Sequence, residues 1–98
     1  MGQPLGQHFL KNMTAITRII DALDLRRGET VIEIGPGKGA LTFPLAAACA
    51  RAGCQLVAIE KDSVLVRKLI SSKVEQLRGV DIIEGDALRE LSQLLSTF

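Results

Sequence analysis

Three short segments rich in Val and Ile alternate with helix-like segments along this chain of 98 residues. The three segments read TVIEI, QLVAIE and VDIIE and occupy residues 30–34, 55–60 and 80–84. Runs of this kind favour buried β-strands. Strands that alternate with helices pair in parallel through right-handed crossovers, and a sheet this apolar needs helices on both faces. The order therefore predicts a doubly wound α/β sheet in which three parallel strands are present.

Helical periodicity predicts four helices around these strands, over residues 13–25, 40–52 and 63–72 and from residue 88 onward. Asn12 is a favourable N-cap for the first helix. The apolar stripe of this helix contains four side chains, Ile16, Ile19, Ile20 and Leu23. In a Rossmann-like sheet ordered 3-2-1, the first strand would lie at an open edge, although its composition suits the centre of a sheet. We therefore expect residues 1–98 to be the N-terminal part of a larger domain, with self-association through that edge.

Composition and targeting signals exclude several classes of protein. The 12 Lys and Arg and 11 Asp and Glu give a net charge of +1, so no overall positive field indicates nucleic acid. Three Phe with no Trp or Tyr offer no stacking platform for single-stranded nucleic acid. Cys49 and Cys54 lack the partners of a zinc site, and no segment is typical of a signal peptide or a membrane span. A cytoplasmic protein without metal is the expectation.

The segment EIGPGKG, residues 33–39, lies between the first predicted strand and the next helix. Glycines there allow a tight turn and the close approach of a ligand, and the helix that follows offers free N–H groups. Gly35, Gly37 and Ala40 satisfy the weak dinucleotide pattern G-x-G-x-x-[GA], so an NAD-dependent oxidoreductase stays an alternative. The phosphate-loop pattern G-x-x-x-x-G-K-[ST] is absent, which argues against a nucleoside triphosphatase.

Three acidic residues stand at or near the C-terminal ends of successive strands. Glu33 lies two residues before Gly35, where a carboxylate suits an ammonium group better than a pyrophosphate. Glu60 ends the second strand and can accept hydrogen bonds from both hydroxyls of a ribose. Asp86 follows the third strand and can accept one from the amino group of an adenine. Each acid alone is typical of a surface charge or a helix cap, but together they favour S-adenosyl-L-methionine over a dinucleotide.

These motifs resemble those of the ribosomal RNA adenine dimethyltransferases. GQHFL at residues 6–10, EIGPGKGALT at 33–42, IEKD at 59–62 and GDAL at 85–88 occur in the order and approximate spacing of that family. The resemblance implies a class I methyltransferase fold with S-adenosyl-L-methionine as cofactor. It also implies ribosomal RNA as partner, with adenines of the small-subunit RNA as the favoured target during ribosome maturation.

The resemblance further implies which residues contact the cofactor. The residues are His8 and Leu10 at the methionine end or ribose, Gly35 and Gly37 at the methionine part, Glu60 at the ribose and Asp86 at the adenine. Many members of the family have Asn where this chain has His8. The catalytic run of the family, Asn-[Ile/Leu]-Pro-[Tyr/Phe], has no counterpart here, so we assign no catalytic residue and expect no methyl transfer by these residues alone. A non-catalytic binding or assembly module with this fold is a second alternative.

Overall fold

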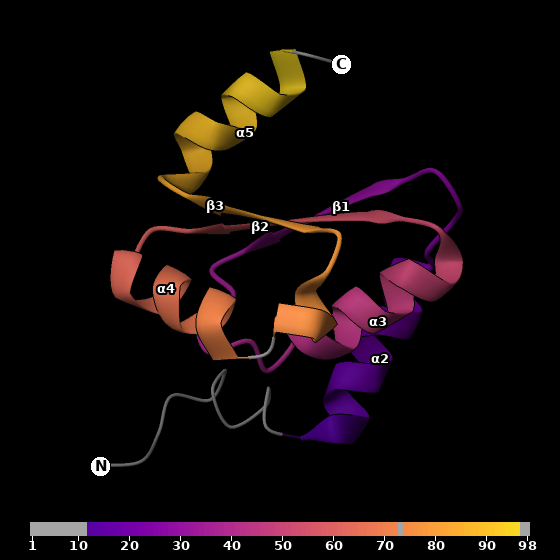
Figure 1. The fold of residues 1–98 in the computed structure, drawn as a ribbon. Coiled ribbons are helices and arrows are strands. Elements are labelled where there is room, and N and C mark those ends of the chain that lie inside the picture. Colours follow the sequence, from indigo (N-terminus) through magenta and orange to yellow (C-terminus); the bar gives the residue numbers. More distant parts are fainter. Residues whose placement is uncertain (1–11, 73, 97–98) are drawn as a thin grey trace.

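The computed structural model describes residues 12–72 and 74–96 and contains one sheet of three parallel strands (Figure 1). The strands are β1 (Thr30–Ile34), β2 (Gln55–Glu60) and β3 (Val80–Glu84). Their bounds are those that the β-branched runs predicted. The strand order is β1-β2-β3 and both pairs are parallel. The predicted α/β sheet, with its first strand at an outer edge among the described residues, is confirmed.

Helices cover both faces of the sheet, as the apolar character of the strands requires (Figure 1). On one face lie α2 (Met13–Leu23), α3 (Thr42–Ala52) and α4 (Ser63–Ser72). On the opposite face lies α5 (Ala87–Ser96). A short 3-10 helix, η1 (Val74–Leu77), leads into β3 and has no counterpart in the sequence prediction. No helix of the described residues is long and apolar enough to cross a membrane.

The core lies between the sheet and the layer of α3 and α4. Residues 56–60 of the central strand β2 are all buried. Leu45 and Cys49 of α3 pack in one cluster with Leu56, and Leu69 of α4 is also fully buried. The other face is covered more thinly, because none of residues 87–96 of α5 is buried. Leu88 of its predicted leucine stripe is 83% exposed.

Two helix ends differ from the prediction. Asn12 caps α2 as expected, because its side chain accepts hydrogen bonds from the backbone N–H groups of Thr14 and Ala15 at 2.9 and 3.3 Å. The helix ends at Leu23 rather than at residue 25, since Asp24 adopts a left-handed conformation with φ 48°. Asp is one of the few residues that tolerate this conformation, and Leu23 of the predicted stripe is consequently exposed. Helix α3 begins at Thr42 rather than at residue 40, because residues 37–41 form turns and a bend.

Candidate ligand-binding site

The three strands end level with one another at one edge of the sheet. Ile34 of β1 pairs with Ile59 of β2, and Glu60 of β2 pairs with Glu84 of β3. Beyond the strands, the Gly35 N–H donates to the Ile59 carbonyl at 2.8 Å and extends the ladder into the glycine loop. Open parallel sheets bind ligands outside the carboxyl ends of their strands. The topology therefore brings the predicted glycines and acids to the edge where such a ligand binds.

The glycine loop leaves open space on the side where a ligand would approach. Gly35 has φ +71°, and a Cβ built on it would meet nothing within 4 Å. Gly39 differs, because a Cβ at its φ of +92° would lie 2.5 Å from Phe43 Cε2 and 2.8 Å from Leu69 Cδ1. Gly39 therefore serves the packing of α3 against α4, whereas Gly35 is free to face a ligand.

The Glu60 carboxylate ties this loop to the end of β2. Its Oε1 accepts a hydrogen bond from the Gly37 N–H, and its Oε2 accepts one from the Asp62 N–H, both at 3.0 Å. The side chain is buried, with 7% of its surface exposed. A carboxylate has about four lone-pair sites, so these two bonds leave acceptor capacity for the hydroxyls of a ligand. The structure thus brings together Gly37 and Glu60, two of the predicted site residues.

Glu33 is a second buried carboxylate on the same face of the sheet. It pairs in register with Ala58, which lies two residues before Glu60, and side chains two residues apart on a strand share a face. Its Oε1 accepts a hydrogen bond from the Thr42 hydroxyl at 2.7 Å. Burial raises the pKa of Glu33 above its ordinary value, and the bond from Thr42 partly opposes that rise. Thr42 ends the EIGPGKGALT motif, but no local spacing rule pairs it with Glu33, so sequence reasoning missed this bond.

Asp86 is exposed and acts as the N-cap of α5. Its Oδ1 accepts hydrogen bonds from the N–H groups of Leu88 and Arg89 at 2.9 and 3.3 Å. Asp62 has the same role at α4, where its Oδ1 accepts from Val64 and Leu65 at 2.8 and 3.3 Å. A capping bond occupies one oxygen of each carboxylate and fixes its direction. Asp86 is therefore held in place just beyond β3, where the sequence predicted a contact with adenine.

Two cysteines and two residues near the N-terminus were also singled out from the sequence. His8 and Leu10 are outside the described residues. Cys49 is buried and Cys54 is half-buried. The pKa of the Cys49 thiol is raised, mainly by burial and to a smaller extent by the nearby Cys54. The described part of the chain contains no group of three or more His, Cys, Asp or Glu side chains that could hold a metal ion. Two cavities of about 410 Å³ lie away from the glycine loop, one beside β3 and one between α2 and α3.

Two curated proteins of similar sequence have the same name. Ribosomal RNA small subunit methyltransferase A of Geobacter metallireducens is 44% identical over 93 residues, which are 94% of this chain and 32% of that protein. The protein of the same name from Pelotomaculum thermopropionicum is 48% identical over 87 residues, which are 86% of this chain and 27% of that protein. This chain therefore spans about a third of the length of these relatives.

Solved structures and a family model agree with this similarity. The 23S rRNA methyltransferase ErmE matches with a TM-score of 0.69 and 30% identity, over 82% of this chain and 31% of that one. An RNA methyltransferase from Salinibacter ruber, solved with S-adenosyl-L-homocysteine, has a TM-score of 0.60 at 22% identity, a likeness of fold, over 88% of this chain and 50% of that one. The model of the family described as ribosomal RNA adenine dimethylase matches residues 2–93. With that match over most of its residues, the chain belongs to the ribosomal RNA adenine dimethylase family.

Proposed function

We propose that this chain is the cofactor-binding part of an S-adenosylmethionine-dependent ribosomal RNA adenine dimethyltransferase that acts on small-subunit RNA. The observation that carries the proposal is that Glu33 and Glu60 lie near the carboxyl ends of β1 and β2, with Asp86 just after β3, at the sheet edge where the glycine loop begins. The names of the relatives support the small-subunit target. We propose a cytoplasmic location for a methyltransferase that acts on this RNA.

The side chains at this edge fit S-adenosylmethionine. The open space over Gly35 admits the methionine part, Glu60 has lone pairs left for the ribose hydroxyls, and Asp86 is fixed beyond β3 for the adenine. When bound, the cofactor supplies an activated methyl group. The pyrophosphate of a dinucleotide would approach two buried carboxylates, Glu33 and Glu60, on one sheet face. The site therefore favours a ligand with a cationic end over NAD.

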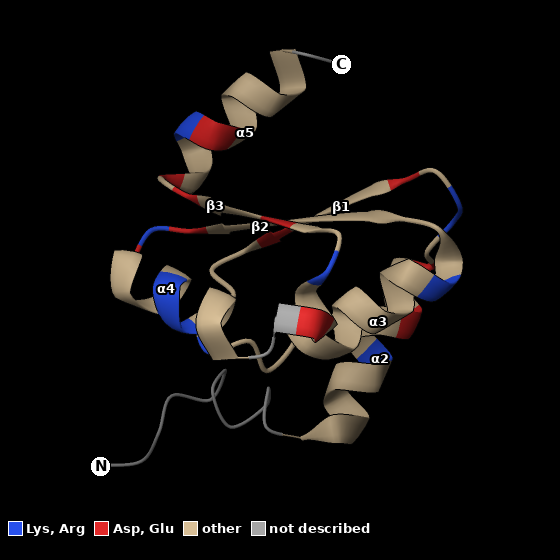
Figure 2. Ribbon diagram, in the orientation of Figure 1, with Lys and Arg blue, Asp and Glu red and all other residues tan. Residues whose placement is uncertain are grey.

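The chain's own residues would hold and orient the cofactor, while the target adenine requires groups from elsewhere. We propose that residues 1–98 are the N-terminal part of the cofactor-binding domain, with His8 and Leu10 as further contacts to the ligand. The sequence has no Asn-[Ile/Leu]-Pro-[Tyr/Phe] run to receive a flipped-out adenine. Acidic and basic residues follow one another where β2 leads into α4 and where β3 leads into α5, so the described residues there carry both signs of charge (Figure 2). We expect cofactor binding without methyl transfer by these residues alone.

The proposal is tested by calorimetric titration with S-adenosyl-L-homocysteine, the demethylated cofactor, and with NAD as the competing ligand. We expect saturable binding of the homocysteine ligand and none of NAD. Glu60→Ala should weaken that binding about 10- to 100-fold, because hydrogen bonds to a charged group contribute about 1.5–3 kcal/mol. Circular dichroism on the same samples shows that the protein is folded.

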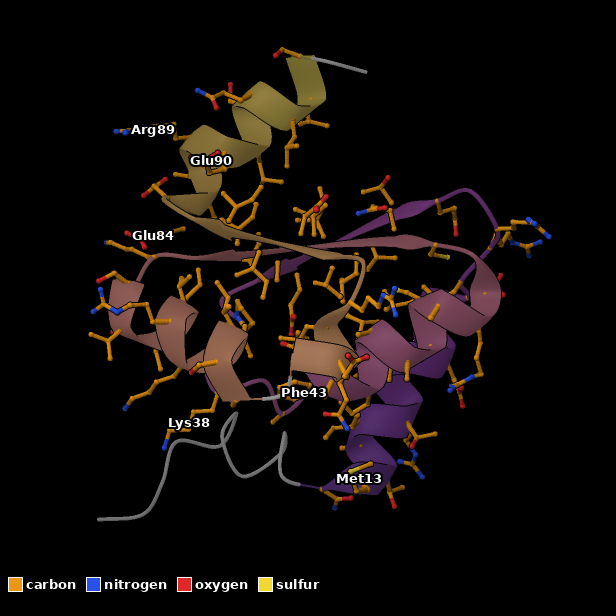
Figure 3. All side chains as sticks on the ribbon, in the orientation of Figure 1. Met13, Lys38, Phe43, Glu84, Arg89 and Glu90 are labelled. Atoms are coloured by element: carbon orange, nitrogen blue, oxygen red, sulfur yellow. The ribbon has the colours of Figure 1, made fainter. Side chains whose placement is uncertain are left out.

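Glu84→Ala is the matched control for Glu60→Ala. Glu84 is the register partner of Glu60 at the end of β3, and its side chain is exposed and points outward (Figure 3). Its removal should leave the affinity unchanged. A folded protein that binds NAD and not S-adenosyl-L-homocysteine would contradict the proposal, as would equal losses in the two variants.

We also propose that the outer edge of β1 is a pairing surface for a second copy of this chain. β1 pairs with β2 alone among the described residues, and its last residue, Ile34, is 60% exposed. An apolar strand with unpaired backbone groups favours addition of another strand.

A further inference from the structure

A hydroxyl and a carboxylate meet in the interior at the base of the glycine loop. Thr42 Oγ1 donates a hydrogen bond to Glu33 Oε1 at 2.7 Å, and the two side chains are 0% and 8% exposed. Thr42 is the first residue of α3, and Glu33 is the last but one of β1. The bond therefore joins the two elements that the glycine loop connects and fixes the direction of the carboxylate.

Among residues 12–72 and 74–96, little besides Thr42 stabilises the negative charge of Glu33. The charged or titratable groups of the elements packed around it are Glu60 on β2, Lys38 in the loop, Cys49 and Arg51 on α3, and Arg67 and Lys68 on α4. Glu60 is another acid on the same sheet face, and Lys38 is exposed and points away from the sheet (Figure 3). The two residues of α3 lie near its far end, and those of α4 are exposed. Within the described part of the chain, the Thr42 hydroxyl is thus the group that favours an ionised, fixed Glu33.

We propose that Thr42 is a positioning residue that holds the Glu33 carboxylate against the amino group of the cofactor without touching the cofactor itself. The inference rests on the proposed function and concerns one end of the ligand only. A buried carboxylate is costly without a partner, and a ligand ammonium group supplies the opposite charge. A carboxylate already held in one direction loses less freedom when that ligand binds.

Two ligands separate this role from a merely structural one. S-adenosyl-L-homocysteine carries the amino group, whereas 5′-methylthioadenosine has the same adenosine and sulfur but no amino-acid end. Thr42→Val removes the hydroxyl at nearly the same volume, and Thr42→Ser keeps it. We expect Thr42→Val to weaken the binding of S-adenosyl-L-homocysteine about tenfold and to leave the binding of methylthioadenosine unchanged. Thr42→Ser should stay within about twofold of the original protein for both ligands.

A double-mutant cycle tests whether Thr42 acts through Glu33. Glu33→Gln alone should weaken the binding of S-adenosyl-L-homocysteine. When Thr42→Val is added to Glu33→Gln, it should cause little further loss of affinity. The loss caused by Thr42→Val alone should also grow as the pH falls toward the raised pKa of Glu33. Without the hydroxyl, the Glu33 carboxyl takes up a proton at higher pH and no longer attracts the amino group.

The outcomes distinguish this inference from the proposed function. If the original protein binds S-adenosyl-L-homocysteine and Thr42→Val binds it equally well, the positioning role is wrong. Equal weakening of both ligands would also overturn it and would show that Thr42 only supports the fold. If the original folded protein binds neither ligand, both the proposed function and the inference fall. Should Thr42→Val not fold, Thr42→Ala takes its place with the same expectations.

Discussion

At the scale of single residues, the buried charge of Glu33 lowers the stability of the fold but is proposed to bind a ligand. Burial raises its pKa above the ordinary value of 4.5, so the folded protein takes up a proton more readily than the unfolded chain. Stability therefore falls as the pH rises from about 4.5 through the raised value, and above that value the full cost of the buried charge is present. A carboxylate kept at such a cost is consistent with a role toward a ligand.

The prediction that follows is a more stable but weaker-binding Glu33→Gln variant. Gln keeps an oxygen that can accept the Thr42 hydroxyl bond and removes the buried charge. Its melting temperature should exceed that of the original protein at pH 7 and match it near pH 4, where Glu33 is protonated. Each kcal/mol gained raises the melting temperature of a domain this small by about 4–8 °C. A lower melting temperature at pH 7, measured by circular dichroism, would show that the ionised carboxylate stabilises the fold.

The sequence predicted the types of residue at the site but not their mutual bonds. Gly35, Gly37 and Glu60 were singled out because glycines and an acid at strand ends are typical of such sites. The bond that Glu60 accepts from the Gly37 N–H depends on how two strands align, which no local pattern specifies. Thr42 was missed for the same reason, since its partner lies across the loop.

At the scale of helices and strands, local sequence sufficed where its signals were unambiguous. The three strands match the prediction because β-branched runs are bounded there by polar residues and glycine. Helix α3 ends at Ala52, as predicted, and Gly53 follows it as a left-handed C-cap. Helix α2 ends earlier than expected, because its left-handed residue is Asp24 and an aspartate carries a weaker stop signal than a glycine. The 3-10 helix η1 has too short a pattern to be predicted.

The two capping aspartates give an element-scale prediction, because Asp62 and Asp86 have nearly identical capping bonds. Asp62→Ala and Asp86→Ala should each weaken their own helix by about 1 kcal/mol. Hydrogen exchange of the amides of α4 and α5 measures this loss. Only Asp86→Ala should also weaken the binding of S-adenosyl-L-homocysteine, measured by calorimetry, since only Asp86 is proposed to reach the adenine. Equal losses of affinity in both variants would mean that Asp86 is a cap and nothing more.

At the scale of the whole molecule, the sheet is asymmetric. Three helices cover one face and α5 alone covers the other, where Leu88 is largely exposed (Figure 1). Among the described residues, β3 and β1 are the two edges, and Ile34 at the end of β1 is 60% exposed. The strand order was predictable from the alternation of elements, because parallel crossovers leave few arrangements. The low burial of α5 was not predictable, since a leucine stripe does not reveal how much of the sheet lies opposite it.

The proposed pairing through β1 predicts association that depends on protein concentration. In sedimentation velocity, the apparent mass of the 98-residue chain should rise with concentration, because unpaired backbone groups of β1 accept a strand from a second copy. Ile34→Lys places a charge at the edge beside those groups and should restore the monomer at the same concentrations. Val64→Lys is the control, since Val64 is 46% exposed but lies on α4, away from that edge. A chain that stays monomeric at every concentration, or that responds equally to both lysines, would show that β1 is not the surface through which copies pair.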